Sequence, residues 1–535
     1  MFCTRRPALV LVLSCCVALV LSSKPTLAAV SFTGDTQIGS PFYVGYTGFG
    51  TFRIDGGSTY TSSSSTTVLG FQSSAVGIAT VTGAGSQWTL TNSSGIDVGG
   101  SGYGRLEVLN GAVVTSSTSC CGGIDIGANS GSQGDVVVDG AGSFVSTGTI
   151  NVGQSSSAGP SRLQVSNNAM VFASQTNITS QGRIELSNGL LRTGQFSTNN
   201  GVIIGTGEVQ FSSTSPINNY GRIESAGAPL RFTGGSGALQ NYGVIAAENG
   251  ALEFNRTISN STTGPNAAEI TLRNASMRMG LLAGSGPQLT NSAVLAAIGG
   301  TSDFYGRVTN TATGSIAVTN RSVMIFHDDV VAEGGNITVF PGSSAVFLED
   351  LTMNEGSQLH ANLAGTNQNT GFGDVEVVGV ATLAGNVQAT LAAGYTPAAG
   401  DSFQIVAASS IAGALSLGDM PALPSGLKWD LDHEASRVIL NVAPGLAGDY
   451  NSNGAVDSGD YVLWRKTLTQ AGPNLAADGN SNGVVDAGDF AFWRSRFADT
   501  AGAGLSNTTT IPEPASITLF FLGLALVGCR GQKLH

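Results

Sequence analysis

Short runs of alternating apolar and polar residues fill the chain from about residue 30 to residue 445. The apolar positions are mostly Val, Ile and Leu, and a Gly or Asn closes most of the runs. Successive side chains of a β-strand point to opposite faces, so the alternation predicts strands with one buried face. Gly and Asn tolerate positive φ, and they therefore predict a tight turn after each strand. The pattern indicates a mainly β chain built from many short strands.

Similar strand sequences return along this region. One motif is Arg105-Leu106-Glu107-Val108, which returns as Arg162-Leu163-Gln164-Val165 and Arg183-Ile184-Glu185-Leu186. Another is Ile96-Asp97-Val98-Gly99, which returns as Ile124-Asp125-Ile126-Gly127 and Ile150-Asn151-Val152-Gly153, and Asn219-Tyr220-Gly221 returns as Asn241-Tyr242-Gly243. One such strand cannot bury its apolar face alone, but stacked copies can.

We therefore predict a right-handed parallel β-helix over residues 29–372. Because Asn-Gly pairs also close two-residue hairpins, a series of antiparallel hairpins or sandwiches is the alternative. In composition the region resembles the repeat region of autotransporter-like passenger proteins.

Residues 373–445 show longer strand patterns, for example at 375–378 and 403–406. This segment resembles the β-rich closing segment that follows such repeats in exported PEP-CTERM proteins. We expect it to cap the open end of the repeat stack, where the last strands would otherwise expose unpaired edges.

The hydrophobic period changes after residue 445. Tyr461, Trp464 and Leu468 are spaced i, i+3, i+7, and Phe490, Trp493 and Phe497 repeat this spacing. That spacing predicts two short amphipathic helices, which we expect to bury their aromatic side chains against each other.

A twelve-residue loop precedes each predicted helix, at residues 449–460 and 478–489. Oxygen-bearing side chains occupy loop positions 1, 3, 5, 9 and 12, and Gly occupies position 6, which is the spacing of a loop that wraps Ca²⁺. The assigned ligands are side-chain oxygens and, at position 7, a backbone carbonyl: Asp449, Asn451, Asn453, Ala455, Asp457 and Asp460 in the first loop, and Asp478, Asn480, Asn482, Val484, Asp486 and Asp489 in the second. The pattern predicts two bound calcium ions. A turn-forming linker without metal is the alternative for either loop alone.

Residues 446–499 resemble a type I dockerin module, in which duplicated calcium loops with Asp at position 12 are each followed by one helix. The resemblance implies docking onto a cohesin-like partner protein. In the family, loop positions 10 and 11 contact the partner and usually carry hydroxyl groups, whereas this chain has Ser458-Gly459 and Ala487-Gly488.

Both ends carry targeting patterns. Residues 1–28 combine Arg5 and Arg6 with an apolar run and a small-residue cleavage site, which predicts a signal peptide. Residues 500–510 form a linker, and residues 511–535 resemble the PEP-CTERM sorting signal, with Pro512-Glu513-Pro514, a hydrophobic segment and a basic end. This resemblance implies processing by an exosortase. The hydrophobic segment is short for a stable bilayer span, so we expect transient retention at the inner membrane.

Charge argues against one class of function, and cysteine content argues against one class of fold. The chain has 23 Lys+Arg and 35 Asp+Glu, and removal of both predicted targeting segments, which takes five basic residues and Glu513, leaves 18 basic and 34 acidic residues and a net charge of −16. Such an acidic chain without a basic cluster does not suit nucleic-acid binding. After removal of both ends only Cys120 and Cys121 remain, which excludes a disulfide framework.

Catalytic constellations are sparse, and we assign no catalytic residue and no cofactor other than calcium. His327-Asp328-Asp329, with Glu349-Asp350 after a turn, could form a base or a metal site, although a solvated loop is the more common meaning of such a group. Arg105, Arg162, Arg183 and Arg222 could bind acidic sugars or pair with neighbouring carboxylates. Few of the acids pair as glycoside cleavage requires.

The sequence therefore favours a non-catalytic exported protein of the cell surface, outer envelope or extracellular matrix. A polysaccharide-active β-helix enzyme, either lyase or glycoside hydrolase, tethered by its dockerin-like module is the main alternative. Binding of an extracellular polysaccharide without cleavage is a third.

Overall fold

A computed structural model describes residues 29–500, except 92–94, 117–122, 156–157, 264–266, 281–287, 369 and 473–474. The predicted signal peptide, the sorting signal, the linker after Thr500 and the Cys120-Cys121 pair lie outside the described residues. The described chain divides into two compact units. The first contains the residues up to Tyr395 with Ser402–Met420 and Leu431–Leu440, and the second contains Thr396–Asp401, Pro421–Asp430 and the chain from Asn441 onward.

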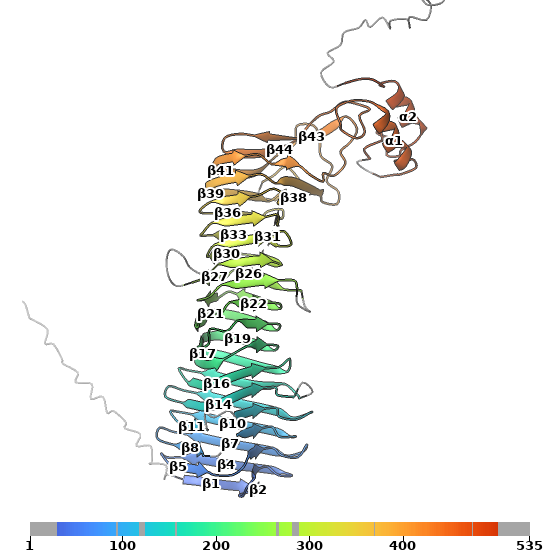
Figure 1. Cartoon of the computed structure of the whole chain (residues 1–535). Coiled ribbons are helices and arrows are strands. Elements are labelled where there is room, and N and C mark those ends of the chain that lie inside the picture. The colour runs from blue at the N-terminus through green and yellow to red at the C-terminus, as the bar shows by residue number, and fades with distance from the viewer. Residues whose placement is uncertain are drawn as a thin grey trace, which may run out of the picture. The chain divides into compact units, whose positions relative to one another are not determined.

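The described residues form one mixed sheet of 44 strands and two short helices. The predicted mainly β fold with a small helical module near the C-terminus is confirmed. Figure 1 shows the strands of the first unit stacked from β1 (Ala29–Gly34) through the green and yellow elements to the orange β41 (Ser402–Gly413).

The stacked strands form three rows, here called A, B and C, and most strands pair with the preceding and the following member of their own row. Row A contains β4 (Phe49–Asp55), β7 (Val76–Thr82), β10 (Tyr103–Leu109), β13 (Gln133–Asp139), β15 (Ser161–Ser166), the first halves of β17 (Gly182–Gln195), β19 (Val202–Phe211) and β21 (Arg222–Gly234), then β23 (Val244–Glu248), β26 (Glu269–Arg273), β29 (Val294–Ile298), β32 (Ser315–Thr319), β35 (Asn336–Val339), β38 (Gln358–Leu363), β40 (Asn386–Leu391) and β42 (Ser416–Leu417).

Row B contains β5 (Thr59–Ser62), β8 (Gln87–Leu90), β11 (Val113–Thr115), the first halves of β14 (Phe144–Val152) and β16 (Met170–Ile178), the second halves of β17, β19 and β21, then β24 (Ala251–Phe254), β27 (Ser276–Met279), β30 (Thr301–Tyr305), β33 (Val323–Phe326), β36 (Ser344–Phe347) and the first halves of β39 (Asp374–Leu383) and β41.

Row C contains β3 (Phe42–Val44), β6 (Thr67–Leu69), β9 (Ile96–Val98), β12 (Gly123–Ile126), the second halves of β14 and β16, then β18 (Thr198–Asn199), β20 (Ile217–Asn219), β22 (Leu239–Asn241), β25 (Ile258–Ser261), β28 (Leu289–Ser292), β31 (Val308–Thr311), β34 (Val330–Glu333), β37 (Leu351–Met353) and the second halves of β39 and β41.

The pairings within these rows are parallel, and this decides how the Asn-Gly turns are used. Asn110 and Gly111 both have positive φ, 57° and 82°, as a tight turn requires. The strands on either side of this turn do not pair with each other, because β10 pairs with β7 and β13, and β11 pairs with β8 and β14. The alternative prediction of an antiparallel hairpin is therefore wrong at this turn.

Alternating side chains build the core between the rows. In β10, every second residue is buried, and Leu106 and Val108 are fully inaccessible to solvent. The parallel register places like side chains above one another, and Phe232 and Phe254 stack with their ring centroids 4.9 Å apart. Phe326 and Phe347 repeat this contact at 4.9 Å. The paired strands of a row thus place their apolar side chains against one another.

A row of buried asparagines runs along the strands of row C. Its six members are in register on consecutive strands of row C and are fully buried: Asn199, Asn219, Asn241, Asn260, Asn291 and Asn310. The Nδ2 of each of the first five donates to the Oδ1 of the next asparagine in the row at 2.7–2.8 Å, and the Nδ2 of Asn310 donates to the backbone carbonyls of Gly314 and Asn336. These bonds satisfy amides that would otherwise be costly to bury.

The first strands close the start of the stack. β1 is antiparallel to β4, and β2 (Thr36–Gln37) is antiparallel to β3. An aromatic cluster at this end of the core includes Phe32 of β1, and Phe52 lies 4.9 Å from both Phe32 and Trp88 between ring centroids. The antiparallel strand covers an edge that would otherwise be unpaired.

The segment predicted as a cap begins as a continuation of the stack. β39 pairs in parallel with β36 and β37, and β41 pairs in parallel with β39. The two remaining strands are β43 (Leu427–His433) and β44 (Arg437–Pro444), of which β44 pairs with β41.

Candidate metal centre

Two short helices follow the acidic loops, as predicted. They are α1 (Ser458–Thr467) and α2 (Ala487–Arg494). Each begins at an aspartate N-cap, Asp457 or Asp486, whose side chain accepts the backbone N–H two residues later. The aspartate at loop position 12 returns a bond to the N-cap backbone N–H and completes a capping box. The last loop positions therefore start the helix as well as close the loop.

Backbone N–H groups orient the oxygen atoms of the first loop. Asp449 accepts from the N–H of Asn453 at 3.0 Å and of Gly454 at 2.7 Å. Asp460 accepts from the N–H of Asn451 at 3.0 Å and of Asp457 at 2.7 Å. These contacts bring the two ends of the loop together.

The second loop repeats this arrangement. Asp478 accepts from Asn482 at 3.0 Å and from Gly483 at 2.7 Å, and Asp489 accepts from Asn480 at 3.1 Å and from Asp486 at 2.7 Å. Gly454 and Gly483, at position 6 of their loops, have φ of 88° and 82°. The sharp turn expected from glycine at this position is present in both loops.

Burial and charge make these loops suited to a cation. Asp460 and Asp489 are fully buried, and Asp478 is 7% exposed. Among the described residues, no Lys, Arg or His pairs with a carboxylate of either loop. Burial raises the pKa of the Asp449 carboxyl, and backbone N–H groups oppose this rise. Buried carboxylates without a cationic side chain are costly unless a metal compensates their charge.

The donor set consists of oxygen atoms, which calcium prefers. Each loop supplies three carboxylates and two Asn amides at the assigned positions. In the part of the chain that the structure describes, no three His, Cys, Asp or Glu side chains alone gather closely enough to hold a metal. Any ion here would therefore also need the amide and backbone oxygens of the loop, as the position-7 assignment to Ala455 and Val484 requires.

Aromatic side chains join the two halves of the module. Its buried core consists of Tyr450, Val456, Trp464, Ala477, Val485 and Trp493. Trp464 lies 5.0 Å from Phe490 between ring centroids, so the predicted contact between the two helices is present, with both tryptophans buried. Tyr461 is 39% exposed, and its expected burial is therefore wrong. The third residue of each predicted stripe lies outside its helix, because both helices are shorter than the stripes. Leu468 is the C-cap of α1, and Phe497 follows the end of α2 and is 54% exposed.

The structure separates the members of the His327 cluster. His327 Nε2 lies 2.7 Å from Asp303 Oδ1, and its ring stacks on Tyr305. Asp328 instead accepts the backbone N–H of Gly306 at 2.8 Å, and Asp329 lies 3.4 Å from Arg307. Asp350 of the neighbouring acidic pair accepts the N–H of Val380 at 2.8 Å. These side chains stabilise different turns and are not brought together into one site.

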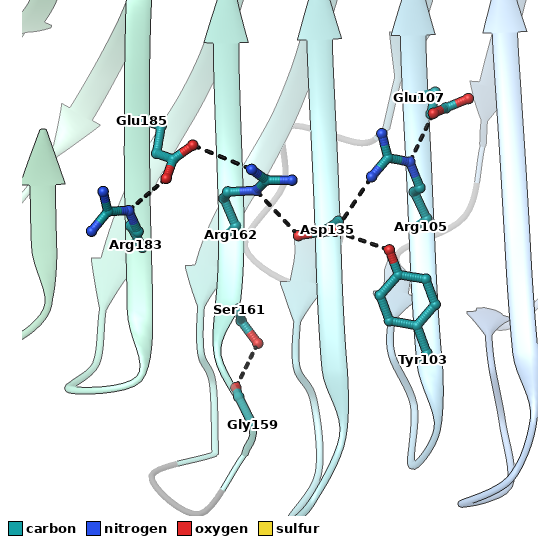
Figure 2. A network of polar contacts seen from close by, with 9 residues as sticks. All are labelled: Tyr103, Arg105, Glu107, Asp135, Gly159, Ser161, Arg162, Arg183 and Glu185. Carbon is teal, nitrogen blue, oxygen red and sulfur yellow. Dashed lines mark hydrogen bonds and ion pairs between the residues drawn. The ribbon is translucent and has the colours of Figure 1, made fainter. Parts of the chain in front are cut away.

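The recurring arginines form an ion-pair network along row A (Figure 2). Asp135 lies 3.4 Å from Arg105 and 3.3 Å from Arg162, and it also accepts the hydroxyl of Tyr103 at 2.9 Å. Arg162 and Arg183 both contact Glu185, at 3.3 and 2.5 Å. Arg222 pairs with Glu224. Of the two alternatives for these arginines, pairing with neighbouring carboxylates is the one that the structure shows.

Sequence reasoning missed a pair of stacked carboxylates. Asp97 of β9 and Asp125 of β12 are in register on adjacent parallel strands. Burial, with a smaller effect of the Asp125 charge, raises the pKa of Asp97 to about 6. Burial also raises the pKa of Asp125, which the hydrogen bond from Asn151 opposes. The repeated Ile-Asp-Val-Gly and Ile-Asp-Ile-Gly motifs were the signal, because equal motifs in a parallel stack place equal residues side by side.

It also missed the polar role of the aromatic residues in the module. Trp464, Trp493 and Tyr450 each donate a hydrogen bond to a backbone carbonyl of the other repeat. A tryptophan four residues before the end of an apolar stripe is ordinary in a helix, so its spacing alone did not reveal a hydrogen-bond donor.

No helix in the described part of the chain is both long and apolar enough to span a bilayer. The hydrophobic segment of the predicted sorting signal lies outside that part.

Comparison with known proteins agrees with the geometry of the loops. Residues 447–497 match the family model described as the dockerin type I domain. A search of curated proteins found no match. The duplicated loops, the two capped helices and this match lead to one conclusion: residues 447–497 form a type I dockerin domain.

Proposed function

We propose that this protein is a non-catalytic exported surface or matrix protein, whose dockerin domain binds two calcium ions and docks onto a cohesin-like partner. Type I dockerin domains bind calcium and cohesin partners, and the match to this family supports a location outside the cell or on its surface. The observation that carries the proposal is the duplicated loop with buried, uncompensated carboxylates at Asp460 and Asp489.

The first ion would be held by the side chains of Asp449, Asn451, Asn453, Asp457 and Asp460 and the carbonyl of Ala455, and the second by Asp478, Asn480, Asn482, Asp486 and Asp489 and the carbonyl of Val484. Calcium would compensate the charge of these carboxylates and fix the start of each helix. The protein residues supply the oxygen ligands and the backbone bonds that orient them.

We propose that the strand rows of residues 29–372 form a right-handed parallel β-helix with residues 373–445 at its end. Three rows of parallel pairs with a turn of chain between them support this architecture. The long polar outer face would be the part presented to the surroundings. The proposal also includes export through a signal peptide at residues 1–28. After the linker of residues 500–510, an exosortase would process residues 511–535, and the protein would be retained transiently at the membrane before its release.

Binding to a panel of type I cohesin domains tests the docking function. The full mature chain should bind at least one cohesin in calcium and release it in EDTA. The Asp460→Asn/Asp489→Asn variant should not bind, whereas Asp430→Asn, a change at an exposed position outside both loops, should bind normally. Failure of every cohesin to bind in calcium would contradict the proposed partner class.

A second candidate function, cleavage of an extracellular polysaccharide, is favoured by the Asp97 and Asp125 pair. Retaining glycosidases use two nearby carboxyl groups, and the acid of the pair has a raised pKa. Incubation with neutral and acidic polysaccharides tests this candidate. Products that disappear in both Asp97→Asn and Asp125→Asn would establish an enzyme, whereas retention on a glycan without products would indicate binding alone.

A further inference from the structure

Each calcium loop is held by backbone from the other half of the dockerin domain. Beside the second loop, the N–H of Thr469 donates to the carbonyl of Val485 at 2.9 Å, and Val485 donates to Gln470 at 2.8 Å. Residues 469 and 470 follow α1, so they belong to the first repeat. Beside the first loop, Val456 donates to the carbonyl of Asp499, which follows α2, at 2.8 Å.

Two tryptophan side chains also donate hydrogen bonds from one repeat to the loop of the other. Trp464 on α1 donates its indole N–H to the carbonyl of Asp486 in the second loop at 2.8 Å. Trp493 on α2 donates to the carbonyl of Asp457 in the first loop at 3.1 Å. Both side chains are buried, with 8% and 9% exposure, so water cannot easily replace these bonds.

The accepting residues lie where loop and helix meet. Asp457 and Asp486 occupy loop position 9 and are the N-caps of α1 and α2. Each also donates its own N–H to the position-12 aspartate at 2.7 Å. A tryptophan that fixes this backbone therefore restrains two of the proposed ligands of the opposite loop.

A third bond reaches the second loop alone. Tyr450 donates its hydroxyl to the carbonyl of Asp489 at 2.8 Å. Its counterpart in the second repeat is Gly479, where an added Cβ would lie 2.3 Å from the Tyr450 hydroxyl oxygen. The centre of the module thus has room for one such side chain.

We propose that Trp464 and Trp493 are positioning residues that couple the two calcium loops, so that an ion in one loop raises the affinity of the other. This inference rests on the proposed assignment of one calcium ion to each loop. Ordering one loop orders its helix, and the helix presents the indole that holds position 9 of the other loop. The second ion then binds a loop whose ordering cost has already been met.

Calorimetric calcium titrations of the full mature chain test the coupling. Asp489→Asn leaves only the first loop to be titrated, Asp460→Asn leaves only the second, and the double variant gives the background. The product of the two wild-type binding constants, divided by the product of the two single-loop constants, is the coupling factor. We expect a factor of about 5 or more in the wild type.

Trp464→Phe/Trp493→Phe removes both indole N–H groups while keeping aromatic rings in the core, and it should bring the factor within about twofold of 1. Tyr461→Phe is the matched control, because it alters a ring of the same cluster that makes neither bond, and it should keep the wild-type factor. Circular dichroism in saturating calcium verifies the fold. If the double Phe variant does not reach that fold, Trp464→Phe alone must lower the factor.

The outcomes separate this inference from the proposed function. Two bound ions with a wild-type factor near 1, or a factor unchanged in the Phe variants, would overturn the coupling and leave the calcium assignment intact. A wild-type chain that takes up no calcium above the double-Asn background would overturn the assignment of the loops and the coupling with it.

Discussion

The aspartates at positions 9 and 12 of the first loop, Asp457 and Asp460, are the same residue type but have different surroundings. Asp460 is fully buried and accepts two backbone N–H groups from its own loop. Asp457 is half-buried and directs its side chain to the N–H of Gly459 at the start of α1. Position 9 of such loops often reaches the ion through water, whereas position 12 binds it directly.

We therefore expect Asp460→Asn to weaken calcium binding at the first loop about tenfold more than Asp457→Asn does. Both changes preserve side-chain shape, and Asn at position 457 still caps the helix. Calorimetry in the Asp489→Asn background, where only the first loop binds, measures both effects. Equal losses from the two changes would contradict the assigned roles.

The stacked pair of Asp97 and Asp125 should make stability depend on pH. The pKa of Asp97 is raised from 3.8 to about 6, mainly by burial, so the folded state favours the protonated form. The contribution of Asp97 to the free energy of unfolding is therefore most favourable below about pH 4, and it declines as the pH rises to about 6. A shift of this size corresponds to at most about 3 kcal/mol at neutral pH.

Asp97→Asn should remove this cost and raise the stability of the β-rich unit at pH 7, with little effect at pH 4. The amide also resembles Asn151, the donor already bonded to Asp125 on its other side. Urea unfolding followed by circular dichroism between pH 4 and 7 measures the change, with the exposed Asp432→Asn as the control. A variant whose stability parallels the wild type across this range would contradict the pKa shift.

At the scale of elements, parallel register converts sequence repeats into rows of equal side chains. Asn219 and Asn241 fall in the repeated Asn-Tyr-Gly motif, and their amides bond to each other while Tyr220 and Tyr242 stack 5.1 Å apart. The same register aligns Arg105, Asp135 and Arg162 into alternating charges. Each row ties a coil to the coils before and after it.

Asn241→Ala should break the asparagine row at its middle. Asn241 donates to Asn260 at 2.8 Å and accepts from Asn219 at 2.7 Å, and all three are fully buried. Loss of these partners should destabilise the unit by about 1–3 kcal/mol. Urea unfolding measures this, and amide exchange should quicken first in β20, β22 and β25. Gln240→Ala, on the outward face of the same strand, should have little effect, and equal effects of the two changes would count against the row.

At the scale of the whole molecule, the β-rich unit and the dockerin domain are stabilised in different ways. The β-rich unit has a continuous apolar core with residues such as Leu106, Phe254 and Phe326 fully buried. The dockerin domain has a core of six buried residues and several buried carboxylates. A small core combined with uncompensated charge makes folding depend on a bound metal.

Removal of calcium should therefore unfold residues 449–499 and leave the β-rich unit folded. Hydrogen exchange of the full chain, read by mass spectrometry, should show protection lost in α1 and α2 and retained in strands such as β10 and β33. EDTA already saturated with calcium is the control. Unchanged protection of both helices in EDTA would show that the domain folds without metal.

Local chemistry in the sequence was sufficient for the strands, the turns and the loops. Strand alternation, positive-φ Asn and Gly, and ligand spacing each depend on residues close together in the chain. The two helices and their buried tryptophans followed from periodicity for the same reason. Where the period continued past the helix, at Phe497, the prediction was wrong because the C-terminal end of a short helix depends on its tertiary contacts.

The tertiary structure alone decided which distant residues meet. Parallel register brought Asp97 beside Asp125, aligned the asparagine row and dispersed His327, Asp328 and Asp329 among separate partners. Packing of the two dockerin repeats brought the indoles of Trp464 and Trp493 each to the loop of the opposite repeat. Spacing along the chain sets the ligands of a loop, but contacts between coils and between repeats depend on register and packing, which no short stretch of sequence contains.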